Sequence, residues 1–192
     1  MKKIKFIAVL LASWLMLHAC LKSETSIPQK TLIEKYAEVD ADSTVFMYFS
    51  FEQNDTIQLK DSSTQLWDVA FKDSLILTNS GVSGPGKGGG LVFKGIYDDI
   101  PCFPDSVTVD IDSTKAPAID TTWYEYDPVA KLVKLIPARV MLIRTGTGKY
   151  AKMEVLKYYK EENGKKLRAQ YTFRYAYQSA GTRPLTDSSI CK

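Results

Sequence analysis

The strongest constraint on the fold of this sequence is an alternation of apolar and polar residues near its C-terminal end. Every second residue of 167–177 is apolar, and the intervening Arg168, Gln170, Thr172 and Arg174 are polar; the apolar set is Leu167, Ala169, Tyr171, Phe173, Tyr175 and Tyr177. A period of two sends successive side chains to opposite faces of a strand. The pattern therefore predicts a long β-strand with one buried face and one face in water.

A hairpin connects this strand to the segment before it. Residues 149–160 and 166–177 are the two predicted arms, and Asn163-Gly164 lies between them. Asn-Gly is typical of two-residue hairpin turns, because both central positions then need positive φ. The sequence thus predicts a long antiparallel C-terminal hairpin.

The rest of the chain also indicates strands. Short runs rich in β-branched and aromatic residues are separated by Gly, Asp and Asn, a pattern typical of an antiparallel sandwich or barrel-like sheet. The expected strands are 44–51, 56–59, 66–71, 75–78, 90–93, 107–111, 121–126, 131–135 and 139–144. One helix is expected, over 26–39, where apolar residues loosely follow a period of 3.6. The predicted fold class is all-β, mostly antiparallel.

The N-terminus has the features of an export signal. Lys2, Lys3 and Lys5 form a short basic region, and the stretch over 4–17 is otherwise almost wholly apolar; it is shorter than the about 20 residues of a membrane-spanning helix. The cut site Leu17-His18-Ala19-Cys20 resembles a lipobox, in which the cysteine thiol receives a diacylglycerol. The alternative is an ordinary signal peptide with a chance cysteine. We expect a signal peptide over 1–19, a lipidated Cys20 with a tether to residue 30, and one β domain over 31–192.

Cleavage would change the charge and the chemistry of the chain. The three lysines of the signal would leave, so Lys plus Arg would fall from 25 to equal the 22 Asp plus Glu. No basic stripe remains to indicate a nucleic-acid partner. His18, the only histidine, would leave as well. The mature chain would lack the commonest general base and metal ligand, and no metal site or catalytic residue is predicted.

Two cysteines remain besides Cys20. Cys102 and Cys191 form an even pair in a chain expected outside the cytoplasm, where disulfides persist. They are either bridged or two separate thiols, and the sequence leaves both readings open.

A glycine-rich stretch over 79–90 is the most unusual part of the chain. Residues 81–87 fit the first positions of a phosphate-binding loop, but Gly88 stands where such a loop needs a hydroxyl. A strand, rather than a helix, is also expected after it. We interpret the stretch as a long turn whose backbone adopts positive φ or passes close to another strand.

These residues resemble the central signature of the HmuY-like family, the haem-binding surface lipoproteins of Bacteroidetes-type bacteria. The matching positions are 67–71, 78–81, 83–84, 86–89 and 92–93, with further likeness at 48–51, 139–144, 148–155 and 171–175. The resemblance implies a mostly antiparallel β fold with an outer-membrane lipid anchor, facing the cell surface or the periplasm. It also implies capture of haem for iron acquisition, with haemoproteins and an outer-membrane haem receptor as partners.

The family's axial haem ligands, histidines or methionines, are not recognisable here. Pro128 falls about where one ligand would lie, and proline cannot coordinate iron. Met47, Met141 and Met153 each lie within an expected strand, where core packing is the favoured role. Tyrosine is a known haem ligand, and Tyr124 and Tyr126 lie in the relevant region, so they are the candidate ligand contacts.

The sequence therefore favours a non-enzymatic lipoprotein that binds a ligand, with haem or another porphyrin implied by the resemblance. The alternative is a structural or protein-interaction lipoprotein that keeps the fold and has lost haem ligation.

Overall fold

The computed structural model describes residues 32–41, 44–187 and 191. The predicted signal peptide and tether, with Cys20, lie outside the described residues. Within the described part of the chain, no helix is long and apolar enough to cross a membrane.

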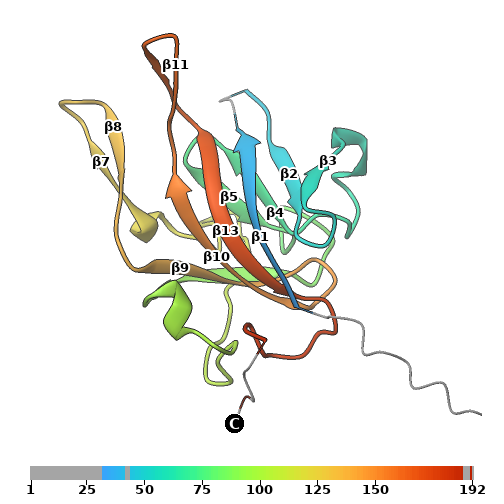
Figure 1. The fold of residues 1–192 in the computed structure, drawn as a ribbon. Coiled ribbons are helices and arrows are strands. Elements are labelled where there is room, and N and C mark those ends of the chain that lie inside the picture. The colour runs from blue at the N-terminus through green and yellow to red at the C-terminus, as the bar shows by residue number, and fades with distance from the viewer. Residues whose placement is uncertain (1–31, 42–43, 188–190, 192) are drawn as a thin grey trace, which may run out of the picture.

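Two antiparallel sheets form the body of the domain (Figure 1). The larger has the strand order β1-β13-β10-β9-β6, and the smaller has the order β3-β2-β4-β5. The larger sheet consists of β1 (Leu32–Asp40), β6 (Gly89–Lys94), β9 (Arg139–Arg144), β10 (Tyr150–Lys157) and β13 (Gln170–Gln178). The smaller consists of β2 (Met47–Ser50), β3 (Asp55–Ile57), β4 (Val69–Lys72) and β5 (Leu75–Thr78). The predicted all-β, antiparallel class is confirmed.

Two further hairpins project from one end of the sheets (Figure 1). They are β7 (Tyr124–Asp127) with β8 (Leu132–Leu135), and β11 (Lys160–Glu162) with β12 (Lys165–Leu167). Three single-turn 3₁₀ helices complete the fold: η1 (Leu59–Asp61), η2 (Tyr97–Asp99) and η3 (Thr121–Trp123).

The main core lies between the two sheets and is rich in aromatic rings. Phe173 of β13 lies 5.2 Å from Phe49 of β2 and 5.4 Å from Phe71 of β4, between ring centroids. These rings belong to one continuous buried cluster from both sheets. Burial of aromatic surface is the main favourable term holding the sheets together.

The predicted helix over 26–39 is wrong in its described part. Residues 32–40 form β1, which pairs with β13 along its whole length. Ala37 and Val39 point into the core, whereas Tyr36 is 68% exposed. The strand forms instead of the helix because β13 offers β1 a complete ladder of backbone hydrogen-bond partners. Such tertiary pairing routinely overrides a weak helical pattern in the sequence.

The C-terminal hairpin forms with its predicted turn, but its stem is interrupted. Asn163 and Gly164 have φ values of 51° and 71°, as the turn requires. The β10–β13 ladder slips between Val155 and Lys157, and Ala169 adopts a φ of 58°. The prediction of two unbroken arms is therefore wrong, since the outer part of the hairpin separates as β11 and β12.

The second face of β13 is not wholly wet. A smaller apolar cluster covers it near Ala176; its buried members are Leu32, Tyr97, Ile100, Phe103, Val140, Leu142, Ala176 and Leu185. Lys152 of β10 lies beneath this cover, and its ammonium group donates to the carbonyl oxygens of Tyr97 at 2.9 Å and Ile100 at 2.8 Å. The segment around η2 thus covers part of a sheet face that the sequence pattern predicted to be exposed to solvent.

The strand expected over 107–111 is wrong as well. Only Asp110 pairs there, in an isolated bridge with Gly90. The buried Asp112 carboxylate instead accepts the N–H groups of Thr78 at 2.9 Å and Ala118 at 2.7 Å, which turns the chain away from the sheet.

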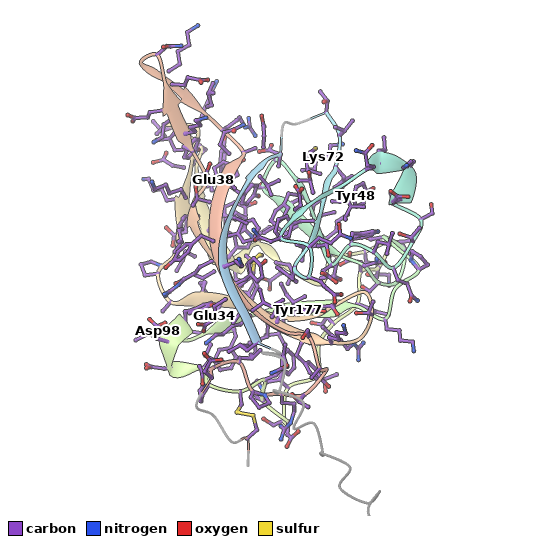
Figure 2. The ribbon with its side chains drawn as sticks, turned by 45° about the vertical axis from the view of Figure 1, so that its right-hand side comes forward. Glu34, Glu38, Tyr48, Lys72, Asp98 and Tyr177 are labelled. Carbon is purple, nitrogen blue, oxygen red and sulfur yellow. A yellow bond between two sulfur atoms is a disulfide. The ribbon has the colours of Figure 1, made fainter. Side chains whose placement is uncertain are left out.

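Cys102 and Cys191 are joined in a disulfide that spans 89 residues of sequence (Figure 2). Nearby, the N–H of Phe103 bonds the carbonyl of Arg183, and that of Leu185 bonds the carbonyl of Pro101. The bridge closes a segment that backbone hydrogen bonds already hold against the loop after η2.

The glycine-rich stretch wraps around one buried side chain. The Asn79 amide donates to the carbonyls of Thr64 and Trp67, and its oxygen accepts the N–H of Gly86 at 2.8 Å. A Cβ atom at Gly86 or Gly88 would lie 2.5 Å from the Asn79 carbonyl oxygen. Glycine is needed because the loop backbone passes so close to Asn79, as the turn interpretation expected.

Candidate ligand site beside the protruding hairpins

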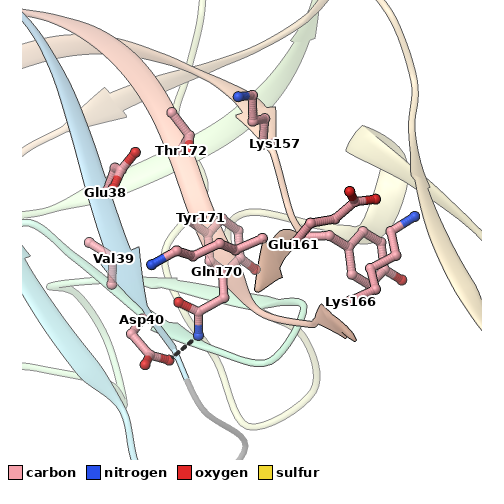
Figure 3. A pocket seen from close by; sticks show the side chains of 11 residues that line it. Glu38, Val39, Asp40, Lys157, Glu161, Lys166, Gln170, Tyr171 and Thr172 are labelled. Carbon is pink, nitrogen blue, oxygen red and sulfur yellow. Dashed lines mark hydrogen bonds between the residues drawn. The ribbon is translucent and has the colours of Figure 1, made fainter. Parts of the chain in front are cut away.

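A broad hollow lies where β1 and β13 meet the base of the β11–β12 hairpin (Figure 3). Its volume is about 720 Å³, within the range of small-molecule sites. It opens at the place where the β10–β13 ladder slips and Ala169 adopts positive φ. The irregularity that interrupts the long hairpin therefore creates the hollow.

The wall formed by β1 and β13 is acidic. Glu38 and Asp40 line it from β1, and the Asp40 carboxylate accepts a hydrogen bond from the Gln170 amide. Tyr171 also belongs to this wall, but its side chain is only 1% exposed and packs in the main core.

The opposite wall, from the end of β10 to β12, carries three lysines: Lys157, Lys160 and Lys166. Lys166 places its ammonium group 4.5 Å from the ring centroid of Tyr159, a cation–π contact. Glu161 is the acidic residue on this side. The hollow is thus divided into an acidic wall and a mainly basic wall.

Tyr159 also connects the hollow to the other projecting hairpin. Its hydroxyl oxygen accepts the backbone N–H of Val133 in β8 at 2.7 Å. Val133 is the cross-strand partner of Tyr126 in β7. One tyrosine therefore lines the hollow and anchors the hairpin that carries the predicted ligand contacts.

The two predicted contacts, Tyr124 and Tyr126, have different surroundings. The Tyr124 hydroxyl lies 3.1 Å from the hydroxyl of Ser74, and its ring lies 4.6 Å from that of Trp123. Tyr126 is 57% exposed. Its position two residues along β7 places it on the same face as Tyr124 but beyond the edge of the core. Of the two phenols, Tyr126 is the accessible one.

The turn between β4 and β5 fixes the base of the β11–β12 hairpin. The Asp73 carboxylate accepts hydrogen bonds from the Tyr158 hydroxyl and the Arg168 guanidinium, and the Asp73 carbonyl accepts the Tyr171 hydroxyl. The hydrogen bond from Arg168 lowers the pKa of Asp73, and burial raises the pKa of Tyr158. Tyr158 and Tyr171 therefore stay protonated, and their hydroxyl groups hold the base of the hairpin through Asp73.

The methionines do not approach the hollow. Met141 and Met153 face one another across β9 and β10, and both are fully buried. Met47 packs against the main core from β2. Pro128 lies in the β7–β8 turn, where Asp127 accepts the N–H groups of Val129 and Ala130. The described residues contain no group of three or more His, Cys, Asp and Glu side chains arranged for a metal ion.

Sequence reasoning missed the lysine wall and Tyr159. The alternation over 167–177 runs through Ala169 without a break, so it gives no sign that the hairpin stem separates there. A signal was available in the four lysines of residues 157–166, a density that is unusual within one expected hairpin.

No protein-family model matches the sequence, and no curated protein matches it either. Solved structures match its fold. An apo HmuY analogue from Tannerella forsythia aligns with a TM-score of 0.55 at 16% identity, covering 77% of this chain and 96% of its own. Apo PinO from Porphyromonas gingivitis aligns with a TM-score of 0.54 at 13% identity, covering 76% and 97%. A candidate lipoprotein from Bacteroides fragilis aligns with a TM-score of 0.50 at 15% identity, covering 74% and 88%. The chain therefore has the HmuY-like fold.

Proposed function

We propose that this chain, built on the HmuY-like fold, is a non-enzymatic, lipid-anchored outer-membrane protein that binds haem or a related porphyrin. The lipobox-like sequence at Cys20 supports the anchor. The fold supports the ligand class, since the sequence resembles a haem-binding family and the structure has that family's architecture.

The hollow beside the hairpins is the observation that carries the proposal. Its volume of about 720 Å³ suits a large flat ligand. Tyr159, which is half-buried, supplies aromatic surface to the hollow, and burying a porphyrin face against such surface is favourable by about 25 cal/mol per Å².

The residues fit a porphyrin that is held without two strong axial ligands. The described residues contain no histidine, and Met141 and Met153 are inaccessible. Neither Tyr124 nor Tyr126 lines the hollow, and Tyr126 is the accessible one of the two, so it is the residue that would donate to iron if the β7–β8 hairpin supplies a ligand. When bound, haem would bring an iron centre that prefers such an anionic ligand in the ferric state.

The second candidate function is a protein-interaction lipoprotein that no longer ligates haem. The burial of two methionines and the loss of histidine favour it. A haemin titration followed by absorbance separates the two. A sharpened, shifted Soret band that saturates supports haem binding, and an unchanged spectrum supports the second function.

Titrating Tyr126→Phe and Tyr124→Phe beside the unaltered protein assigns the ligand. A changed ferric spectrum in Tyr126→Phe alone would identify Tyr126. Unchanged spectra in both variants would mean that neither phenol reaches the iron.

A further inference from the structure

We infer that the hollow recognises the carboxylate groups of its ligand, so that a tetrapyrrole dicarboxylate is held by its acidic edge rather than through its metal. This inference rests on the proposed function and names the part of the ligand that the protein binds.

The basic wall carries the inference. Lys157, Lys160 and Lys166 line the hollow from three successive strands, β10, β11 and β12, and Figure 3 labels Lys157 and Lys166. Among the ion pairs between described residues, none involves these three ammonium groups. Lys166 lies over the Tyr159 ring, and Lys157 and Lys160 have no such aromatic contact among the described residues. Ammonium groups outside ion pairs at the rim of a partly enclosed site can form charge-assisted hydrogen bonds with carboxylates.

The acidic wall fixes the orientation of the ligand. Glu38 and Asp40 face the hollow from β1, and Asp40 is already bonded to Gln170. Carboxylates of a ligand placed against this wall would be repelled, whereas the same groups against Lys157 and Lys160 would be attracted. The ligand edge that bears the carboxylates should therefore face the hairpin.

Tyr159 binds part of the remainder of the ligand. It is half-buried and stands beside the lysines, whereas the Tyr171 side chain is enclosed in the main core. The site therefore offers apolar surface for a ring and cations for its edge. Neither feature requires a metal at the centre of the ring.

The test compares protoporphyrin IX with its dimethyl ester, which keeps the ring and removes both charges. Each is titrated into the full mature protein in the same dilute detergent, and binding is followed by porphyrin fluorescence. We expect the ester to bind at least about tenfold more weakly, because it forfeits the charged contacts.

Single substitutions locate the effect. Lys157→Gln and Lys160→Gln should each weaken binding of the free acid about threefold to tenfold and leave binding of the ester unchanged. Glu38→Gln should strengthen binding of the acid. Lys94→Gln, an exposed lysine on β6 outside the hollow, is the matched control and should change nothing. All four side chains are exposed, so the variants should fold normally.

The outcomes separate this inference from the proposed function. Equal binding of acid and ester, or lysine variants that behave like Lys94→Gln, would overturn the inference and leave porphyrin binding standing. Failure of haemin, protoporphyrin and the ester to bind at all would overturn both.

Discussion

The Tyr159 hydroxyl accepts the backbone N–H of Val133 at 2.7 Å, and this hydrogen bond joins the two projecting hairpins of the domain. The Tyr159 ring meanwhile lies under the Lys166 ammonium group. One side chain thereby positions both the β7–β8 hairpin and the basic wall of the hollow.

Replacing Tyr159 by Phe should loosen the β7–β8 hairpin without unfolding the domain. A net hydrogen bond of this kind is worth about 1 kcal/mol, so amide hydrogen exchange at Val133 should become about fivefold faster. Tyr126→Phe is the control, because it removes an exposed hydroxyl from the same hairpin. Unchanged exchange at Val133 in Tyr159→Phe would show that the contact does not hold the hairpin.

The disulfide between Cys102 and Cys191 should contribute measurably to stability. Its closed loop of 89 residues is long, and a loop of that size typically gives about 2–5 kcal/mol. Unfolded, unreduced protein carrying Cys20→Ser should show no free thiol in an Ellman assay, and Cys102→Ser in that background should lower the free energy of unfolding. Two titratable thiols would rule the bridge out.

Asp68 should make stability depend on pH. Its carboxylate accepts the N–H groups of Phe51 at 2.8 Å and Gly146 at 3.1 Å. Burial outweighs these bonds and raises the pKa of Asp68 from 3.8 to about 7. A raised folded pKa means that the native state binds the proton more tightly than the unfolded state. The stabilisation is complete below about pH 4 and is lost as the pH rises through about 7.

The free energy of unfolding should therefore fall by a few kcal/mol between pH 5 and pH 8 through this group. Urea unfolding across that range, compared with the isosteric Asp68→Asn, isolates the effect. A variant whose slope with pH matches that of the unaltered protein would refute the assignment.

The all-β class and the Asn163-Gly164 turn were predictable from sequence because each depends on local chemistry. Alternation fixes which face of β13 is buried, and positive φ at two positions selects the turn residues. The β1 strand was missed because its conformation comes from pairing with β13, which is distant from it in the sequence. The hollow was missed because it opens at Ala169. The alternation of apolar and polar residues continues through this position, but the backbone leaves the extended conformation there.

The lipid anchor remains a prediction from the sequence around Cys20. Cys20→Ser should abolish incorporation of a labelled fatty-acid analogue and move the protein from the membrane fraction to the soluble fraction. Cys102→Ser serves as the control for a general effect of cysteine loss. Label retained in Cys20→Ser would disprove lipidation at this position.

The central claim is that the protein binds a porphyrin without two axial ligands. Parallel titrations of haemin and iron-free protoporphyrin IX test it most directly. The described residues offer no histidine, and Met141 and Met153 are buried, so iron should add little to the affinity. We predict that the two dissociation constants agree within about tenfold, or 1.4 kcal/mol. A low-spin, six-coordinate haemin spectrum with far tighter binding than protoporphyrin would contradict the account.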